Sequence, residues 1–97
     1  MLIDKPYTEG DTITFKTIAG EEVVARLEKK DQDSIRVKKP MALTAAQGGI
    51  GMVPFTFTVA PDTPLEINLA TVVFIAKTDS AMASQYIEST TGIKITN

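Results

Sequence analysis

The sequence, 97 residues long, contains no cysteine and no histidine. Without cysteine there is no disulfide and no thiolate zinc site, and without histidine the commonest metal ligand and general base is missing. Metal binding would then need clustered carboxylates, and no pair at loop spacing indicates them. A serine or threonine nucleophile would need a lysine or a carboxylate as its base, and no such set is recognisable. We therefore predict that the protein is not an enzyme and has no catalytic residue, metal site or cofactor.

The chain is also poor in net charge and in long apolar runs. A formal net charge of −2 excludes the strongly basic character of a dedicated duplex-DNA binder, although it does not exclude a local basic patch. The longest apolar run, residues 70–76, is far shorter than the roughly 18 residues of a membrane span and fits a strand buried on both faces. Residues 1–5 do not form a secretory signal. We predict a cytoplasmic protein without a membrane partner, folded as a single domain over residues 1–97.

The most informative segment is residues 11–39, where polar and apolar residues alternate in three runs separated by turns at Gly20 and at residues 31–33. This alternation is typical of an antiparallel meander with one buried face. We predict strands at residues 12–16, 22–28 and 34–38. The predicted core face consists of Ile13, Phe15, Val23, Leu27, Ile35 and Val37. The opposite face carries Lys16, Arg26, Glu28, Arg36 and Lys38.

Two further strands are predicted after the meander. Pro40 should end the third strand, because proline cannot donate a ladder hydrogen bond. Residues 47–51 are rich in glycine, but a strand rather than a helix follows them, which excludes a phosphate-binding loop. The fourth strand is predicted at residues 52–60. Its alternating apolar residues favour a core face over a platform for stacking bases, and they are Val53, Phe55, Phe57 and Val59.

The last third of the chain combines a strand with a helix. Residues 61–64 predict a turn, and residues 65–75 predict a fifth strand that bends near Asn68. Residues 79–90 change to helical periodicity, with Asp79 or Ser80 as the N-cap and Gly92 as the stop. Residues 93–95 alternate and fit either a tail or a small added strand. We predict a barrel over residues 10–76 and a helix that covers an open end of it.

Five strands in this order resemble the Sm-like fold of LSm proteins and bacterial Hfq. The register of the first Sm motif is occupied by Gly20, Val23, Ala25, Leu27 and Asp31, and the second motif falls on residues 67–75. The resemblance spans residues 10–76, and the chain is similar to the atypical Sm-like chains of bacteriophages. It implies an all-β fold, a small five-stranded antiparallel Sm-like barrel with a C-terminal α-helix.

The same resemblance implies self-assembly. Sm-like proteins close homo-oligomeric rings of five to seven copies by pairing the fourth strand of one copy with the fifth strand of the next. Such closure also removes exposed strand edges, which are aggregation hazards. The expected partner of the chain is therefore itself.

A pore-side site for single-stranded RNA is implied as well, and family register places it at Lys29, Lys30, Asp31, Gln32, Asp33, Ser34 and Asn68. The two lysines would contact phosphate. The site departs from the family pattern, because residues 32–34 lack the aromatic and Asn that hold a base, and Asn68–Leu69 stand in place of Arg–Gly. We therefore expect weak binding of single-stranded RNA.

Two alternatives remain open from the sequence. Asp31 and Asp33, repeated around a pore, would repel phosphate, so the ring could instead be structural or bind proteins after losing nucleic-acid binding. The basic residues could equally form an ordinary solvated face that Glu21, Glu22 and Glu28 neutralise.

Overall fold

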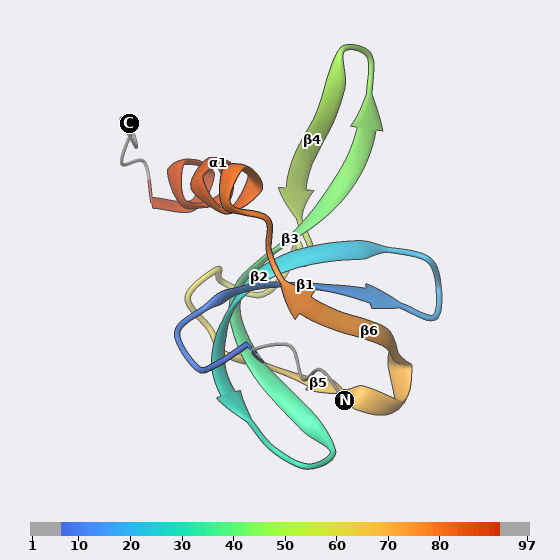
Figure 1. The fold of residues 1–97 in the computed structure, drawn as a ribbon, viewed down its shortest axis with the longest axis vertical. Coiled ribbons are helices and arrows are strands. Elements are labelled where there is room, and N and C mark those ends of the chain that lie inside the picture. The colour runs from blue at the N-terminus through green and yellow to red at the C-terminus, as the bar shows by residue number, and fades with distance from the viewer. Residues whose placement is uncertain (1–6, 92–97) are drawn as a thin grey trace, which may run out of the picture.

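The computed structural model describes residues 7–91, which form a strongly bent sheet, a short 3₁₀ turn and one α-helix (Figure 1). The strands are β1 (Thr12–Thr17), β2 (Glu22–Lys30), β3 (Ser34–Ala46), β4 (Gly49–Pro54), β5 (Leu65–Asn68) and β6 (Val72–Lys77). The 3₁₀ turn η1 covers Leu69–Thr71, and the helix α1 covers Ser80–Thr91. The order along the sheet is β4-β3-β2-β1-β6, with β5 also paired to β3, and every pairing is antiparallel.

The predicted meander and its core are confirmed. The core cluster contains all six predicted residues, each at most 1% exposed, together with Ala25. Each large apolar side chain contributes about 1.5–3 kcal/mol when it is fully buried, so this face is the main source of stability. The β2–β3 register shifts between Val24 and Arg26, an irregularity of the kind that bends a strand. Ala25, between these two residues, is fully buried.

The prediction that Pro40 ends the third strand is wrong, because β3 continues to Ala46. The first part of β3 pairs with β5 and its last part pairs with β4. Pro40 lies between these two pairings and contributes only its carbonyl oxygen, which accepts from the backbone N–H of Phe55 at 3.0 Å. A proline is tolerated there because the pairing partner changes at this point and no N–H is required.

The predicted fourth strand is also displaced. The glycine-rich segment belongs to β4 and to the tight turn before it, where Gly48 has a φ of +88°. The resulting β3–β4 hairpin projects away from the rest of the sheet (Figure 1). On β3, only residues 38–40 lie between the part that pairs with β5 and the part that pairs with β4. Between β4 and β5 themselves, the chain has the ten residues 55–64. Residues 55–64 therefore loop out of the sheet.

Half of the apolar face predicted for the fourth strand is exposed. Phe57 is 90% exposed and Val53 is 40% exposed, while Phe55 packs against the core cluster. The predicted fifth strand is likewise two strands, β5 and β6, separated by η1. Residues 70–76 are not buried on both faces, because β6 is an end strand and leaves Val73 and Phe74 exposed. The described residues thus form six strands instead of the predicted five.

The predicted helix is present as α1, and Asp79 caps it by accepting from the backbone N–H of Met82 at 3.4 Å. Hydroxyl groups of Thr14 and Thr78 lie 2.9 Å apart, which joins the start of α1 to β1. Val24 alternates away from the core but is fully buried. The expected stop at Gly92 and the alternating residues 93–95 lie outside the described residues. Within residues 7–91, no helix is long and apolar enough to cross a membrane.

Candidate nucleic-acid interface and assembly edges

The turn between β2 and β3 lies against the end of β5. Ser34 pairs with Asn68 in the sheet register, and the backbone N–H of Leu69 donates to the carbonyl oxygen of Asp33 at 2.9 Å. The turn is closed by the N–H of Asp31, which donates to the carbonyl oxygen of Ser34 at 2.9 Å. The fold therefore brings the predicted turn and Asn68 together, although they lie far apart in the sequence.

Two side chains of this predicted site already have partners within the protein. The Asn68 side-chain oxygen accepts from the backbone N–H of Ala70 at 2.9 Å and caps η1. The Ser34 hydroxyl donates to a Glu66 carboxylate oxygen at 3.0 Å. A base that used either of these atoms would have to replace an existing hydrogen bond. The pocket is thus not preformed for base recognition.

The two predicted lysines have different surroundings. The Lys30 ammonium donates to the carbonyl oxygen of Tyr7 at 3.1 Å and lies 4.5 Å from the centre of its ring. The backbone N–H of Lys30 also donates to the Glu9 carboxylate at 3.2 Å. Lys29 is exposed and lies directly opposite Arg36 on β3. Lys30 is therefore held toward the segment before β1, and Lys29 is the more accessible of the two.

Carboxylates offset the positive charge around the turn. Arg36 forms an ion pair of 3.3 Å with Glu66, and both side chains are about half exposed. Glu66 therefore lies between Arg36 and the Ser34 hydroxyl, while Asp31 and Asp33 are exposed in the turn itself. The acidic character expected of the turn is increased by Glu66. Sequence reasoning missed Glu66 and Tyr7, although Glu66 could have been found from the register that pairs it with Arg36.

The proposed neutralisation of the basic face holds only in part. Glu28 contacts both Arg26 and Lys38 at 3.6 Å. Glu22 begins β2 and pairs with Lys16 on β1, whereas Lys29 and Lys30 lie at the other end of β2. The ion pairs found within residues 7–91 join neither Glu21 nor Glu22 to a cation of this face.

A second candidate site lies at the two ends of the sheet. Four of the exposed large apolar residues of the described chain lie on the end strands, Ile50 and Val53 on β4 and Val73 and Phe74 on β6. A groove of about 690 Å³ runs beside β4. Its walls include the apolar residues Leu43, Ile50, Val53, Phe55 and Phe57 and the charged residues Lys16, Glu21 and Glu22. One end of the sheet thus presents a groove with apolar and charged walls, and the other end presents a strand with exposed apolar residues.

Comparison with solved structures supports the fold. A heptameric archaeal Sm protein superposes with a TM-score of 0.51 at 14% identity, over 73% of this chain and 90% of that one. The SmAP1 heptamer of P. aerophilum gives a TM-score of 0.50 at 14% identity, over 74% of this chain and 84% of that one. The chain has an Sm-like fold. No family model matches the sequence, and no curated protein matches it closely enough to be significant.

The Sm-like fold accounts for the position of the second predicted motif. Residues 67–75 span the end of β5, the η1 turn and the start of β6, so the motif marks the point where the chain crosses from β3 to β1. In this Sm-like sheet, the strand that follows β3 is split into β4 and β5 by residues 55–64. The apolar edge of β4 and the predicted RNA site next to β5 are therefore separated along the same interrupted strand.

Proposed function

We propose that the protein assembles head to tail into a homo-oligomeric ring of five to seven copies, in which β6 of one copy adds to β4 of the next. The observation that carries this proposal is the position of the exposed apolar residues, which mark both end strands of the sheet. End strands present unpaired backbone N–H and C=O groups, and pairing them satisfies those groups and covers the apolar side chains. Two different edges in contact make a heterologous interface, which closes into a ring when the rotation allows it.

Two features of the chain support this assembly. Residues 40–61 contain no charged residue, and this range includes β4 and most of the β3–β4 hairpin. Interface cores are depleted of charge in the same way. Both structurally similar proteins are described as heptamers, and this likeness at 14% identity supports the fold on which the proposal rests. We assign the ring the role of an interaction scaffold, because its predicted nucleic-acid site is occupied by internal hydrogen bonds and flanked by carboxylates.

Multi-angle light scattering on the wild-type chain tests the assembly. We expect a mass of five to seven copies at micromolar concentration. A stable monomer at that concentration would exclude the ring.

Weak binding of single-stranded RNA at the turn of residues 31–34 is the second candidate function. The observation that favours it is the pairing of Ser34 with Asn68, which places the two halves of the predicted site side by side. With three carboxylates nearby, we expect dissociation constants of roughly 10⁻⁴–10⁻⁶ M, the range of non-specific nucleic-acid binding at physiological salt. Titration with labelled oligo(U) and oligo(A) at two salt concentrations tests it, because phosphate contacts produce a salt-dependent affinity.

A further inference from the structure

A cavity of about 230 Å³ lies between the end of α1 and the outer face of β1 and β2. Its walls contain two cationic side chains and no carboxylate, and they consist of Gly10, Thr12, Arg26, Lys39, Tyr86, Ile87, Thr90 and Thr91. A concave site lined by charge of one sign concentrates the potential and attracts the opposite charge. The cavity is thus suited to an anion.

The two cations are only weakly neutralised by the rest of the protein. Arg26 approaches Glu28 no closer than 3.6 Å, and Lys39 approaches Asp62 at 3.8 Å. The Asp62 side chain is 83% exposed, so solvent screens this pair strongly. Arg26 also lies directly opposite Lys38 on the neighbouring strand, so the single carboxylate of Glu28, which contacts both at 3.6 Å, is shared between two cations.

Lys39 is held in an unusual backbone conformation at this cavity. Its φ is +52°, in a region that a lysine rarely adopts. The Tyr86 hydroxyl donates to the Lys39 carbonyl oxygen at 2.7 Å, and the Lys39 N–H donates to the carbonyl oxygen of Pro61 at 3.0 Å. Strained residues persist where their surroundings fix them, and they cluster at ligand sites. The strain at Lys39 is an independent indication of such a site.

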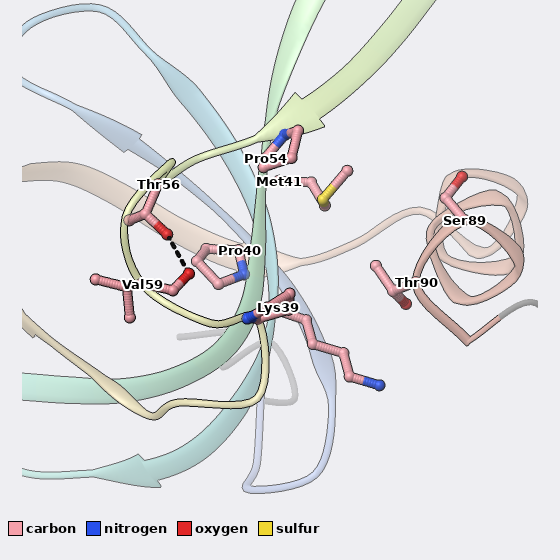
Figure 2. A pocket seen from close by; sticks show the side chains of 9 residues that line it. Lys39, Pro40, Met41, Pro54, Thr56, Val59, Ser89 and Thr90 are labelled. Atoms are coloured by element: carbon pink, nitrogen blue, oxygen red, sulfur yellow. Dashed lines mark hydrogen bonds between the residues drawn. The ribbon is translucent and has the colours of Figure 1, made fainter.

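A second cavity adjoins the first and is mainly apolar. It has a volume of about 210 Å³ and shares Lys39 and Thr90 with the first cavity (Figure 2). Its other walls are Pro40, Met41, Pro54, Thr56, Val59, Pro61 and Ser89. Figure 2 shows the Lys39 side chain extending from β3 toward α1, at the boundary of this space.

We propose that these adjoining cavities bind a small phosphate monoester with a short apolar group. The phosphate lies between Arg26 and Lys39, and the apolar group lies against Met41 and Val59. A phosphate monoester carries about −1.5 to −2 charges at pH 7, which matches two cations, and the planar guanidinium of arginine suits phosphate oxygens. This site is separate from the turn of residues 31–34 and does not depend on ring assembly.

Calorimetric titration of the full-length protein with inorganic phosphate and with butyl phosphate tests the two parts of the site. Each buried methylene is worth about fourfold in affinity, so butyl phosphate should bind more than about tenfold tighter than inorganic phosphate. Equal affinities would overturn the apolar part of the proposal. Absence of binding by butyl phosphate at millimolar concentration would overturn the whole proposal.

Substitutions locate the phosphate. Arg26→Gln and Lys39→Gln should each weaken butyl phosphate binding about tenfold, because each removes a charge-assisted hydrogen bond. Lys16→Gln is the matched control, since it removes the same charge from β1, the strand that pairs with β2, outside both cavities and outside the predicted RNA site, and it should change the affinity less than twofold. Arg26 is 60% exposed, so Arg26→Gln remains a test even where Lys39→Gln does not fold. An equal loss in Lys16→Gln would show diffuse electrostatic attraction and contradict the assigned site.

Discussion

The hydroxyl group of Tyr86 donates a 2.7 Å hydrogen bond to the carbonyl oxygen of Lys39. Lys39 lies in the short stretch where β3 changes its partner from β5 to β4, and Tyr86 is the buried residue of α1. The helix is thereby fixed to the point from which the β3–β4 hairpin projects (Figure 1). Any change in this contact should affect the position of the hairpin as well as the packing of the helix.

Tyr86→Phe should destabilise the fold by about 1–3 kcal/mol, because it leaves the Lys39 carbonyl oxygen without its side-chain donor. Urea unfolding of the variant and the wild type measures this difference. Thr91→Val is a suitable control, since it removes an exposed hydroxyl from the same helix, which donates within α1 to the carbonyl oxygen of Ile87. A loss as large in the control would show that the Tyr86 contact is not special.

Tyr86 should also make the stability of the fold depend on pH. Burial raises the pKa of Tyr86 from 10.0 to about 12, and the nearby Arg26 opposes this in part. Because the pKa is higher in the folded state, the contribution to stability is complete below pH 10 and is lost as the pH rises from 10 toward about 12. The difference in unfolding free energy between wild type and Tyr86→Phe should shrink over that range. A constant difference would contradict the burial of a neutral phenol.

Replacement of Lys39 by glycine tests the backbone strain. Glycine adopts a φ of +52° without steric cost, while a side chain in the left-handed region costs roughly 1–2 kcal/mol. Lys39→Gly should therefore be neutral or stabilising by up to about 1 kcal/mol, despite the entropy that glycine loses on folding. Lys38→Gly, one residue earlier in the same strand, should destabilise by about 0.5–1 kcal/mol. Thermal unfolding of both variants decides the matter, and equal losses would exclude strain at Lys39.

The predicted RNA site can be strengthened or weakened by substitution. Asn68→Arg should increase affinity for oligo(U), because it adds a planar cation that can stack on a base. It also removes the cap of η1, so a stability loss of about 0.5–2 kcal/mol should accompany the gain. Lys29→Ala with Lys30→Ala should weaken binding and reduce its salt dependence. If the wild type binds RNA and neither change alters the affinity, the RNA site lies elsewhere. If the wild type forms no complex with RNA at low salt, RNA binding is excluded and the scaffold function remains.

The parts of the fold that could be predicted from sequence depend on local alternation. Ile13, Phe15 and their counterparts on β2 and β3 alternate within short runs, so their burial follows from the period of a strand. The change of pairing partner at Pro40 depends instead on contacts with residues 55–64. Such contacts between distant segments cannot be predicted from the local alternation of residues. The exposure of Phe57 follows from that loop, and a strictly alternating sequence therefore predicted a buried residue that is 90% exposed.

The candidate site shows the same division. The resemblance to Sm-like proteins was sufficient to group Ser34 with Asn68, and the structure pairs the two residues. The partners of the individual side chains could not be predicted, because they depend on where β5 and the segment before β1 lie in space. Glu66 engages Ser34 and Arg36, and Tyr7 engages Lys30, so atoms expected to meet RNA are bonded within the protein.

The most direct test of the head-to-tail assembly is native mass spectrometry on two variants, alone and mixed. Val53→Lys places a charge on β4, and Val73→Lys places one on β6, so each variant keeps one intact edge. Each variant alone should be a monomer. The mixture should form a 1:1 heterodimer and nothing larger, because the intact β6 of one variant pairs with the intact β4 of the other. Homodimers of either variant alone, or wild-type-sized rings in the mixture, would contradict the pairing of β4 with β6.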